Sequence, residues 1–423
     1  MARALLVDGR HHMLTRRATA QLLATTAIAA ALGGVPAFAA DKVVKIGIDL
    51  SLTGADSQGA GRVKNAIVMA FDAANQGNTV PGYKFELLVT DDGTATAGQY
   101  DPAQAATNAR KMVADKEVVA AIGPQMSGAG KAMTPILSQG GLATITPSST
   151  NPDITNPKFA EQYRPAGKPI YFRTVTTDAY QGPNMANFFA EKLKVKSVYV
   201  LDDSGAFGVG VADSFQKQAE AKGIKVAGRD RLDPKAADYT AILTKIKSLS
   251  PEAIYYGGVT QAGVKLAKQA YDIVPNLIKG GPDGMTSSDL LSGAGFPAVE
   301  GWYTSIAAPH LVEDTKAAQF IQAFKARFND SPDDYTITAY DASLVILDAV
   351  KRVAAAGKPV TREAVRDAIQ TAKVPTIQGV VSFDENGDLA DRTVSVFQIK
   401  KDTSKSLTDV SAQYKYIDVA PQS

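Results

Sequence analysis

The sequence contains no cysteine and has three histidines among its 423 residues. Two of them, His11 and His12, fall in the first 39 residues, which leaves His310 in the remainder. Without cysteine there are no disulfide bonds and no thiol for lipid attachment, so stability has to come from packed cores. A zinc site or a histidine-dependent catalytic triad would rest on one residue. We therefore expect a protein that is not an enzyme and holds no metal or other cofactor.

The sequence also lacks a clear excess of one charge. It has 45 Lys and Arg against 43 Asp and Glu, and four of the arginines and one aspartate lie in the first 39 residues. The rest of the chain is therefore close to neutral. This balance gives no electrostatic reason to bind nucleic acid or an anionic membrane surface.

The first 39 residues have the pattern of a secretory signal peptide. Arg16-Arg17 is followed by an apolar, alanine-rich run from Leu22 to Val35 and by the small-residue motif Ala37-Phe38-Ala39. The apolar run is shorter than the roughly 20 residues of a membrane span. We expect cleavage after Ala39, export to the periplasm and no membrane insertion of the mature chain. The paired arginines leave a twin-arginine export route open beside the general secretory one.

Short apolar runs then alternate with segments of helical periodicity. Strands are expected at 42–50, 83–90, 118–122 and 142–146, with helices at 63–75, 102–114 and 127–139. After a proline-rich loop at 151–169, strands are expected at 170–175, 197–201, 225–231, 253–256, 276–280 and 299–305, with helices at 182–194, 208–222, 239–249 and 261–271. The C-terminal part predicts helices at 315–328, 338–356 and 361–372 and strands at 379–383 and 394–400. This alternation predicts an α/β fold with two doubly wound parallel-sheet lobes and a cleft between them.

Two hydroxyl-rich turns follow neighbouring strands of the first lobe. The turn at 123–128 ends in Ser127-Gly128, and the turn at 146–152 contains Ser148-Ser149-Thr150. The carboxyl ends of parallel strands meet at one sheet edge, where helix-start amides favour a small anion such as a carboxylate. The alternative is that these hydroxyls only cap turns and helices.

Two other segments resemble known binding motifs but lack residues that those motifs require. Gly128-Ala129-Gly130-Lys131 lacks the first glycine and the final hydroxyl of a phosphate-binding loop. The acidic loop at 384–388 is too short for a calcium-binding loop of the EF-hand type, and its Asn386-Gly387 pair favours a hairpin turn. Neither motif predicts nucleotide or metal binding.

Several segments together resemble the leucine/isoleucine/valine-type periplasmic binding proteins of ABC importers. These segments are Ile46-Gly47 with Ser51-Leu52-Thr53-Gly54, Asp91-Asp92, Ala121-Ile122-Gly123-Pro124, 145–150, Phe172-Arg173-Thr174, Gln181-Gly182, Tyr255-Tyr256-Gly257-Gly258, Gly281-Pro282-Asp283-Gly284 and 383–388. Each piece is a weak signal, but they occur in the family's order along nearly the whole chain after residue 39.

The resemblance implies two lobes that close on a ligand about three crossover strands. With crossings near Val175, Ile306 and Ser382, lobe 1 would comprise residues 40–175 and 307–381, and lobe 2 residues 176–306 and 382–423. It also implies a monomer that delivers a small amino acid, branched-chain or otherwise aliphatic, to a membrane permease.

The resemblance further implies which residues hold the ligand. Ser127 and Gly128, helped by the second turn at Ser148 and Ser149, would hold a carboxylate. The residues implied for the ammonium group are Thr150, Asp283 and Asp178. For Asp178, capping of its helix is the alternative role.

The implied site departs from the leucine-type pattern on its second wall. Phe207 stands where a tyrosine is usual, Val259 stands where an aromatic residue is usual, and Asp283 is shorter than the usual glutamate. For Phe207 plain core packing is the alternative. These departures leave open an amide, an aromatic acid or another carboxylate as ligand, and sensing for a signalling receptor rather than transport.

Overall fold

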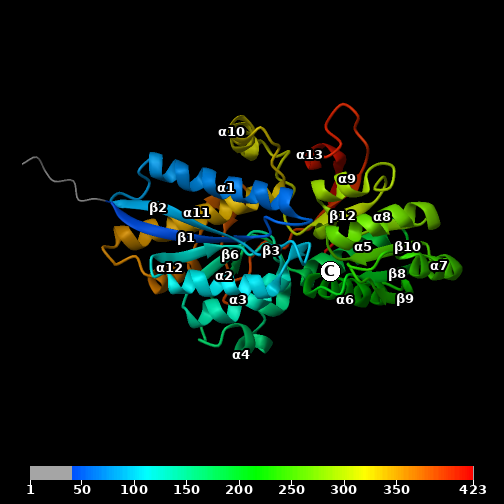
Figure 1. Ribbon diagram of the computed structural model, residues 1–423, viewed down its shortest axis with the longest axis horizontal. Coiled ribbons are helices and arrows are strands. Elements are labelled where there is room, and N and C mark those ends of the chain that lie inside the picture. Colours follow the sequence, from blue (N-terminus) through cyan, green and yellow to red (C-terminus); the bar gives the residue numbers. More distant parts are fainter. Residues whose placement is uncertain (1–40, 423) are drawn as a thin grey trace, which may run out of the picture. The chain divides into compact units, whose positions relative to one another are not determined.

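A parallel five-stranded sheet, in the order β2-β1-β5-β6-β7, forms the first lobe (Figure 1). The computed structural model describes residues 41–422, so the expected signal peptide lies outside the described residues. The strands are β1 (Lys42–Leu50), β2 (Tyr83–Asp91), β5 (Val118–Ile122), β6 (Ala143–Thr146) and β7 (Tyr171–Arg173).

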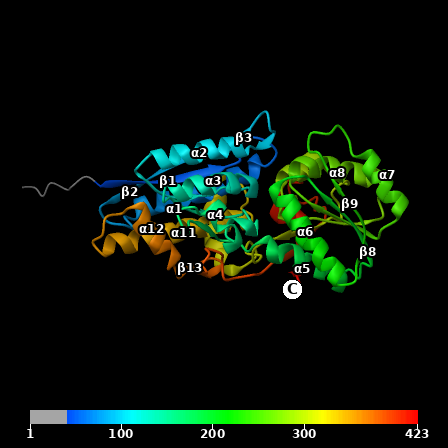
Figure 2. The same ribbon diagram turned by 90° about the horizontal axis from the view of Figure 1, so that it is seen from below.

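Helices cover both faces of this sheet. The helices of one face are α1 (Ser57–Gln76), α10 (Ala318–Phe328), α11 (Asp334–Ala355) and α12 (Arg362–Gln370). The other face carries α2 (Pro102–Ala114) and α3 (Ser127–Gln139). Figure 2 shows α1 and α2 on opposite sides of β1. The carboxyl ends of β5 and β6 are left free for the two hydroxyl-rich turns.

The second lobe is built on a seven-stranded sheet in the order β16-β15-β12-β11-β10-β8-β9. Its strands are β8 (Ser197–Asp202), β9 (Lys225–Arg231), β10 (Ala253–Gly257), β11 (Ile278–Gly280), β12 (Tyr303–Ile306), β15 (Ser395–Ile399) and β16 (Tyr414–Val419). Its helices are α5 (Asp178–Glu191), α6 (Ala206–Ala221), α7 (Thr240–Leu249), α8 (Thr260–Ile273) and α9 (Ser288–Ala294). The last two strands run antiparallel to their neighbours.

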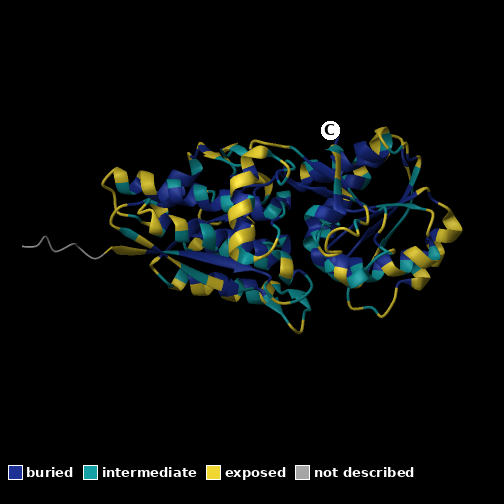
Figure 3. Ribbon diagram, turned by 90° about the horizontal axis from the view of Figure 1, so that it is seen from above, coloured by how far each residue is buried: buried dark blue, intermediate teal, exposed yellow. Residues whose placement is uncertain are grey.

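Strand residues of the second sheet alternate between two separate cores. Val198 and Val200 of β8 pack with α5 and α6, whereas Tyr199 and Leu201 pack with α7, α8 and α9. Successive side chains of a strand point to opposite faces, and a sheet covered on both sides buries both sets. The strands are accordingly buried and the outer helix faces exposed (Figure 3).

Smaller elements complete the described chain. They are the hairpins β3 (Gly93–Thr94) with β4 (Gln99–Tyr100) and β13 (Val374–Thr376) with β14 (Gly379–Val381), the short helices α4 (Ala160–Tyr163) and α13 (Val410–Gln413), and the 3₁₀ turns Pro152–Ile154, Pro157–Phe159, Asp283–Met285 and Thr315–Ala317.

The chain passes between the two sheets three times. The first passage follows β7 and the second follows β12, and the two are joined where the Thr176 amide donates to the Ala307 carbonyl at 2.8 Å. After β14, residues 383–389 still contact the first lobe, since the Arg173 amide donates to the Gly387 carbonyl. The third passage therefore lies between Leu389 and the start of β15, a few residues beyond the expected position near Ser382.

The α/β fold with two sheet-based lobes is confirmed, and the differences from expectation are local. The helix expected at 182–194 begins earlier, at Asp178, and carries Pro183 inside it. Strand β16 and helix α9 were not expected from the sequence. No helix among residues 41–422 is long and apolar enough to cross a membrane.

Candidate functional site

A cavity lies between the two lobes at the carboxyl ends of β5, β6, β8 and β10. It encloses about 660 Å³, its mouth included. Its lining residues come from both lobes: Asp56, Gly59, Arg62, Val63, Gln125, Met126, Ser127, Ser148, Phe207, Val259, Asp283, Gly284, Thr286, Ser287, Asp333 and Tyr335. This is the position at which open α/β sheets bind small molecules.

The two hydroxyl-rich turns are joined to each other beneath the cavity. Ser127 is the first residue of α3, and its Oγ accepts from the Asn151 amide at 3.2 Å. Ser148 Oγ donates to the Gln125 carbonyl at 3.1 Å. Gly123, which begins the first turn, has φ +108°, and a Cβ there would lie 2.2 Å from the Asp49 carbonyl oxygen. Only glycine can hold this turn so close to β1.

Two residues implied for the carboxylate lie just behind the lining. A Cβ on Gly128 would lie 2.5 Å from the ring of Tyr100, so the helix start packs directly on that ring. Ser149 is buried and its Oγ donates to Ser127 Oγ at 3.4 Å. Of the hydroxyls in the two turns, those of Ser127 and Ser148 line the cavity, and Ser149 lies behind them and donates to Ser127.

The second turn is held from below by Arg173 of β7, which is completely buried. Its guanidinium donates to the carbonyls of Ser149, at 2.5 Å, and Asn151, at 2.8 Å, and pairs with Asp388 at 2.8 Å. The arrangement fixes the carbonyls of Ser149 and Asn151, and the Thr150 side chain lies close enough to Asp178 to lower the pKa of that carboxyl. From the sequence, Arg173 was noted only as part of the segment Phe172-Arg173-Thr174, and its role in holding the turn was not predicted.

Three acceptor oxygens implied for the ammonium group have no hydrogen-bond partner. They are Thr150 Oγ1, Asp178 Oδ2 and Asp283 Oδ1, and all three side chains are more than nine-tenths buried. The second oxygens of the two carboxyls are occupied: Asp178 Oδ1 accepts from Gln181 at 3.0 Å, and Asp283 Oδ2 accepts from Tyr335 at 2.5 Å. Asp178 is the first residue of α5, and its Oδ1 is bound by the Gln181 side chain rather than by a helix amide.

Burial raises the pKa of both carboxyls. The pKa of Asp178 is raised to about 8, with the nearby charge of Asp283 adding to the effect of burial. The pKa of Asp283 is raised to about 6, because burial outweighs the hydrogen bond from Tyr335. Two buried carboxyls so close together are relieved by a cation between them.

An apolar wall closes the opposite side of the cavity. Phe207, at the start of α6, packs with Val211 and with Val259, and Met126 of the first lobe covers them. Phe207 and Val259 both line the cavity, so they belong to its surface as well as to a small core.

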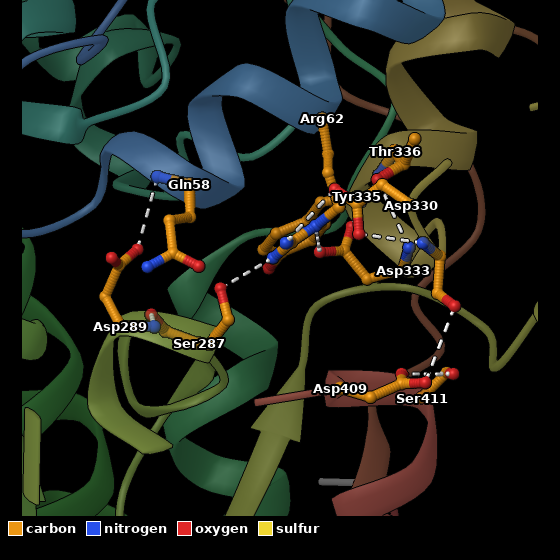
Figure 4. Close-up of polar contacts among 12 residues, drawn as sticks. Gln58, Arg62, Ser287, Asp289, Asp330, Asp333, Tyr335, Thr336, Asp409 and Ser411 are labelled. Atoms are coloured by element: carbon orange, nitrogen blue, oxygen red, sulfur yellow. Dashed lines mark hydrogen bonds and ion pairs between the residues drawn. The ribbon is translucent and has the colours of Figure 1, made fainter. Parts of the chain in front are cut away.

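Hydrogen bonds cross between the lobes beside the cavity (Figure 4). Arg62 of α1 donates to Ser288 Oγ of α9 at 3.1 Å, and the Gln58 amide donates to Asp289 Oδ2 at 3.3 Å. Asp333, before α11, accepts from Arg62 Nε at 3.1 Å and so holds the guanidinium in place.

Two further bonds cross elsewhere. Asn151 Nδ2 donates to the Ala206 carbonyl, and Gln261 Nε2 donates to the Ala97 carbonyl, both at 2.9 Å.

Sequence reasoning missed Asp56, Arg62 and Tyr335. They reach the cavity from α1 and from the start of α11, which lie far apart in the chain, and no local motif marks them. Asp56 was missed for a further reason: the first helix was expected to begin at Val63, whereas it begins at Ser57, directly after Asp56.

His310 lies away from this cavity. Its Nδ1 is 3.1 Å from Asp334 Oδ2 and its ring stacks on Tyr416. Among residues 41–422 there is no group of three or more histidine, cysteine or acidic residues that could hold a metal ion.

Comparisons with known proteins place these features in context. A family model described as periplasmic binding protein matches residues 43–404. The leucine-, isoleucine-, valine-, threonine- and alanine-binding protein of Pseudomonas aeruginosa is 31% identical over 388 residues, covering 91% of this chain and 98% of that protein. The Leu/Ile/Val-binding protein BraC3 of Rhizobium johnstonii is 30% identical over 376 residues, covering 88% and 96%.

Solved structures share the fold. The leucine-binding protein LivK of Thermotoga maritima superposes with a TM-score of 0.76 at 26% identity, covering 89% of this chain and 98% of that one. A solute-binding protein of Rhodopseudomonas palustris in complex with benzoate reaches a TM-score of 0.73 at 19% identity, covering 90% and 98%.

Proposed function

Because the chain belongs to the periplasmic binding protein family, we propose that it binds an α-amino acid in the cavity between its lobes and delivers it to the permease of an ABC importer. The two relatives described above are named as binding proteins for branched-chain and other small amino acids. The first candidates are therefore leucine, isoleucine, valine, threonine and alanine.

One observation carries the proposal: the three unpartnered acceptors Thr150 Oγ1, Asp178 Oδ2 and Asp283 Oδ1. Buried acceptors without donors cost free energy, and a primary ammonium group has three N–H donors to give them. Beside them, Ser127 at the start of α3 offers a hydroxyl and helix-start amides to a carboxylate. An ammonium group and a carboxylate group attached to the same carbon atom define an α-amino acid.

Closure of the lobes follows from the placement of these groups. The carboxylate partners lie in the first lobe, whereas Asp178 and Asp283 lie in the second. The ligand's full set of contacts exists only when the lobes are together, which couples binding to closure. The hydrogen bonds that cross between the lobes support a closed arrangement of the two lobes.

We further propose that residues 1–39 direct export and are removed, and that the mature protein acts as a monomer in the periplasm without catalysis. The pairing of His310 with Asp334, outside the cavity, supports a structural role for this histidine.

Calorimetric titration of the purified protein, freed of bound ligand, tests the proposal. The panel comprises the five amino acids above, and 4-methylpentanoate serves as the matched control, since it is leucine without the amino group. We expect at least one amino acid to bind and 4-methylpentanoate to bind far more weakly. Failure of every α-amino acid would overturn the proposal.

Benzoate belongs in the same panel because a structural neighbour was solved with it. An aromatic carboxylate could use Ser127 and the wall at Phe207, but it would leave Asp178 and Asp283 without a donor. If benzoate binds and no amino acid does, Asp178 and Asp283 do not take part in ligand binding. Asp283→Ala would then leave the affinity unchanged.

A further inference from the structure

The wall that would face a bound amino acid's side chain is polar at one end. Phe207, Val259 and Met126 form an apolar part, but Asp56 lines the cavity beside them. Its side chain is 7% exposed and its Oδ2 has no hydrogen-bond partner. This oxygen is separate from the three acceptors assigned to the ammonium group.

Helix capping does not explain the burial of Asp56. It stands at the N-cap position of α1, with φ −117° and ψ 13°, but its side chain caps no helix amide. A hydrogen bond with the Thr260 side chain lowers the pKa of Asp56, whereas the nearby carboxylates of Asp289 and Asp203 raise it, and the Oδ2 atom is left without a partner. A buried carboxyl with a free oxygen costs stability unless a donor completes it.

The neighbouring cation does not serve Asp56. Arg62 is the one cation among the described residues that line the cavity, and it is bound by Asp333 at 3.1 Å and by Asp330 at 3.8 Å. Burial raises the pKa of Asp56 to about 7, and Asp289 and Asp203 add to the effect. The site therefore has unused capacity for a hydrogen-bond donor.

There is also room beside Asp56. Gly59 lies one helical turn further along α1 and lines the same cavity. A Cβ on Gly59 would have no atom within 4 Å, so the space next to the carboxyl is open.

We propose that Asp56 is a second polar subsite of the cavity and selects amino acids whose side chain carries a hydrogen-bond donor, a hydroxyl or an ammonium group. This rests on the proposed function, because the α-amino and carboxylate groups must be held by the first subsite. The ligand then spans from Asp178 and Asp283 at one end to Asp56 at the other.

Two pairs of ligands with the same shape test the subsite by calorimetry at constant pH. Threonine and valine differ by a hydroxyl in place of a methyl group, and lysine and norleucine differ by the terminal ammonium. We expect the donor-bearing member of at least one pair to bind about 10- to 100-fold more tightly, the effect of a hydrogen bond to a charged group. Equal binding within both pairs overturns the inference.

Variants at position 56 separate the two donor types. Asp56→Asn keeps an acceptor oxygen but removes the charge, so a preference for threonine would survive and a preference for lysine would be lost. Asp56→Ala removes both and is expected to abolish either preference. Thermal unfolding verifies that each variant is folded, and an unchanged preference in Asp56→Ala contradicts the proposal.

Asp289→Asn is the matched control. It removes a carboxylate from the same neighbourhood that does not line the cavity, so the ratio within each ligand pair should stay as in the wild type. If this variant changes the ratio as much as Asp56→Ala does, the preference comes from the general field and the subsite is not at Asp56. If no amino acid binds the wild type, the proposed function is wrong. If amino acids bind but both members of each pair bind equally, only the inference about Asp56 is wrong.

Discussion

At the scale of single residues, the most informative group is the buried carboxyl of Asp178. Its pKa is raised from 3.8 to about 8 in the folded protein. Between these values the folded state keeps a proton that the unfolded chain releases, so the free energy of unfolding falls as the pH rises through this window.

Asp178→Asn should therefore stabilise the ligand-free protein more at pH 8 than at pH 5. The amide keeps the shape of the carboxyl but cannot ionise. The variant is therefore not destabilised as the pH rises, whereas the wild type is. Urea unfolding at the two pH values measures the difference. Asp272→Asn, at an exposed position of α8, is the control. A gain for Asp178→Asn that is the same at both pH values would contradict a buried, raised carboxyl.

Some residues of the candidate site could be predicted from the local sequence around them, and others could not. Ser127 and Thr150 could be proposed from sequence because hydroxyl-rich turns after strands are a local signal. Asp56 and Tyr335 could not, since what matters about them is the tertiary placement of α1 and α11. Asp56 is also the N-cap residue of α1 in the structure, a position that the expected helix start at residue 63 did not reveal.

At the scale of helices and strands, α1 of the first lobe and α9 of the second are joined by a hydrogen bond. Arg62 reaches from the first lobe to Ser288 of α9, while its own lobe holds it through Asp333. The bond to Ser288 is present only when the two helices are close. It therefore stabilises the closed form and contributes nothing to an open one.

Ser288→Ala should weaken ligand binding about 10-fold, because the closed form loses a hydrogen bond to a charged group. The dissociation rate should rise by most of this factor, since the bond forms during closure. Stopped-flow measurements with a ligand found by calorimetry give both rates. Ser292→Ala removes an exposed hydroxyl from the same helix and should leave them unchanged. An unaltered dissociation rate in Ser288→Ala would show that this contact does not hold the lobes.

Elements with regular periodicity and clear ends were predictable. The bounds expected for β1, α2, β5, α3 and β9 agree with those observed. Strand β16 was missed because it is half exposed and follows a polar loop, and its stability comes from pairing with β15. The start of α5 was misplaced because Gly182 and Pro183 read as a helix beginning, whereas the packing of α5 on α6 carries the helix through them.

At the scale of the whole molecule, the passages between the lobes decide how closure can occur. Two of them are tied by the bond from Thr176 to Ala307, so they are expected to bend together rather than separately. The family relationship predicts this hinged arrangement, but the position of the third passage depends on a tertiary contact. Asp388 pairs with the buried Arg173, which keeps residues 383–389 on the first lobe.

The ligand's own charges should drive closure. In the proposed binding mode the ammonium group of the ligand binds Asp178 and Asp283 of the second lobe while its carboxylate binds Ser127 of the first, so the ligand should bind the closed form much better than the open one. Small-angle X-ray scattering should show a smaller radius of gyration after addition of a saturating amino acid. 4-Methylpentanoate, even at saturation, should leave the radius unchanged, because it offers no donor to the second lobe. If the carboxylate alone compacts the protein, closure depends on the first lobe's anion site and the buried acids do not govern it.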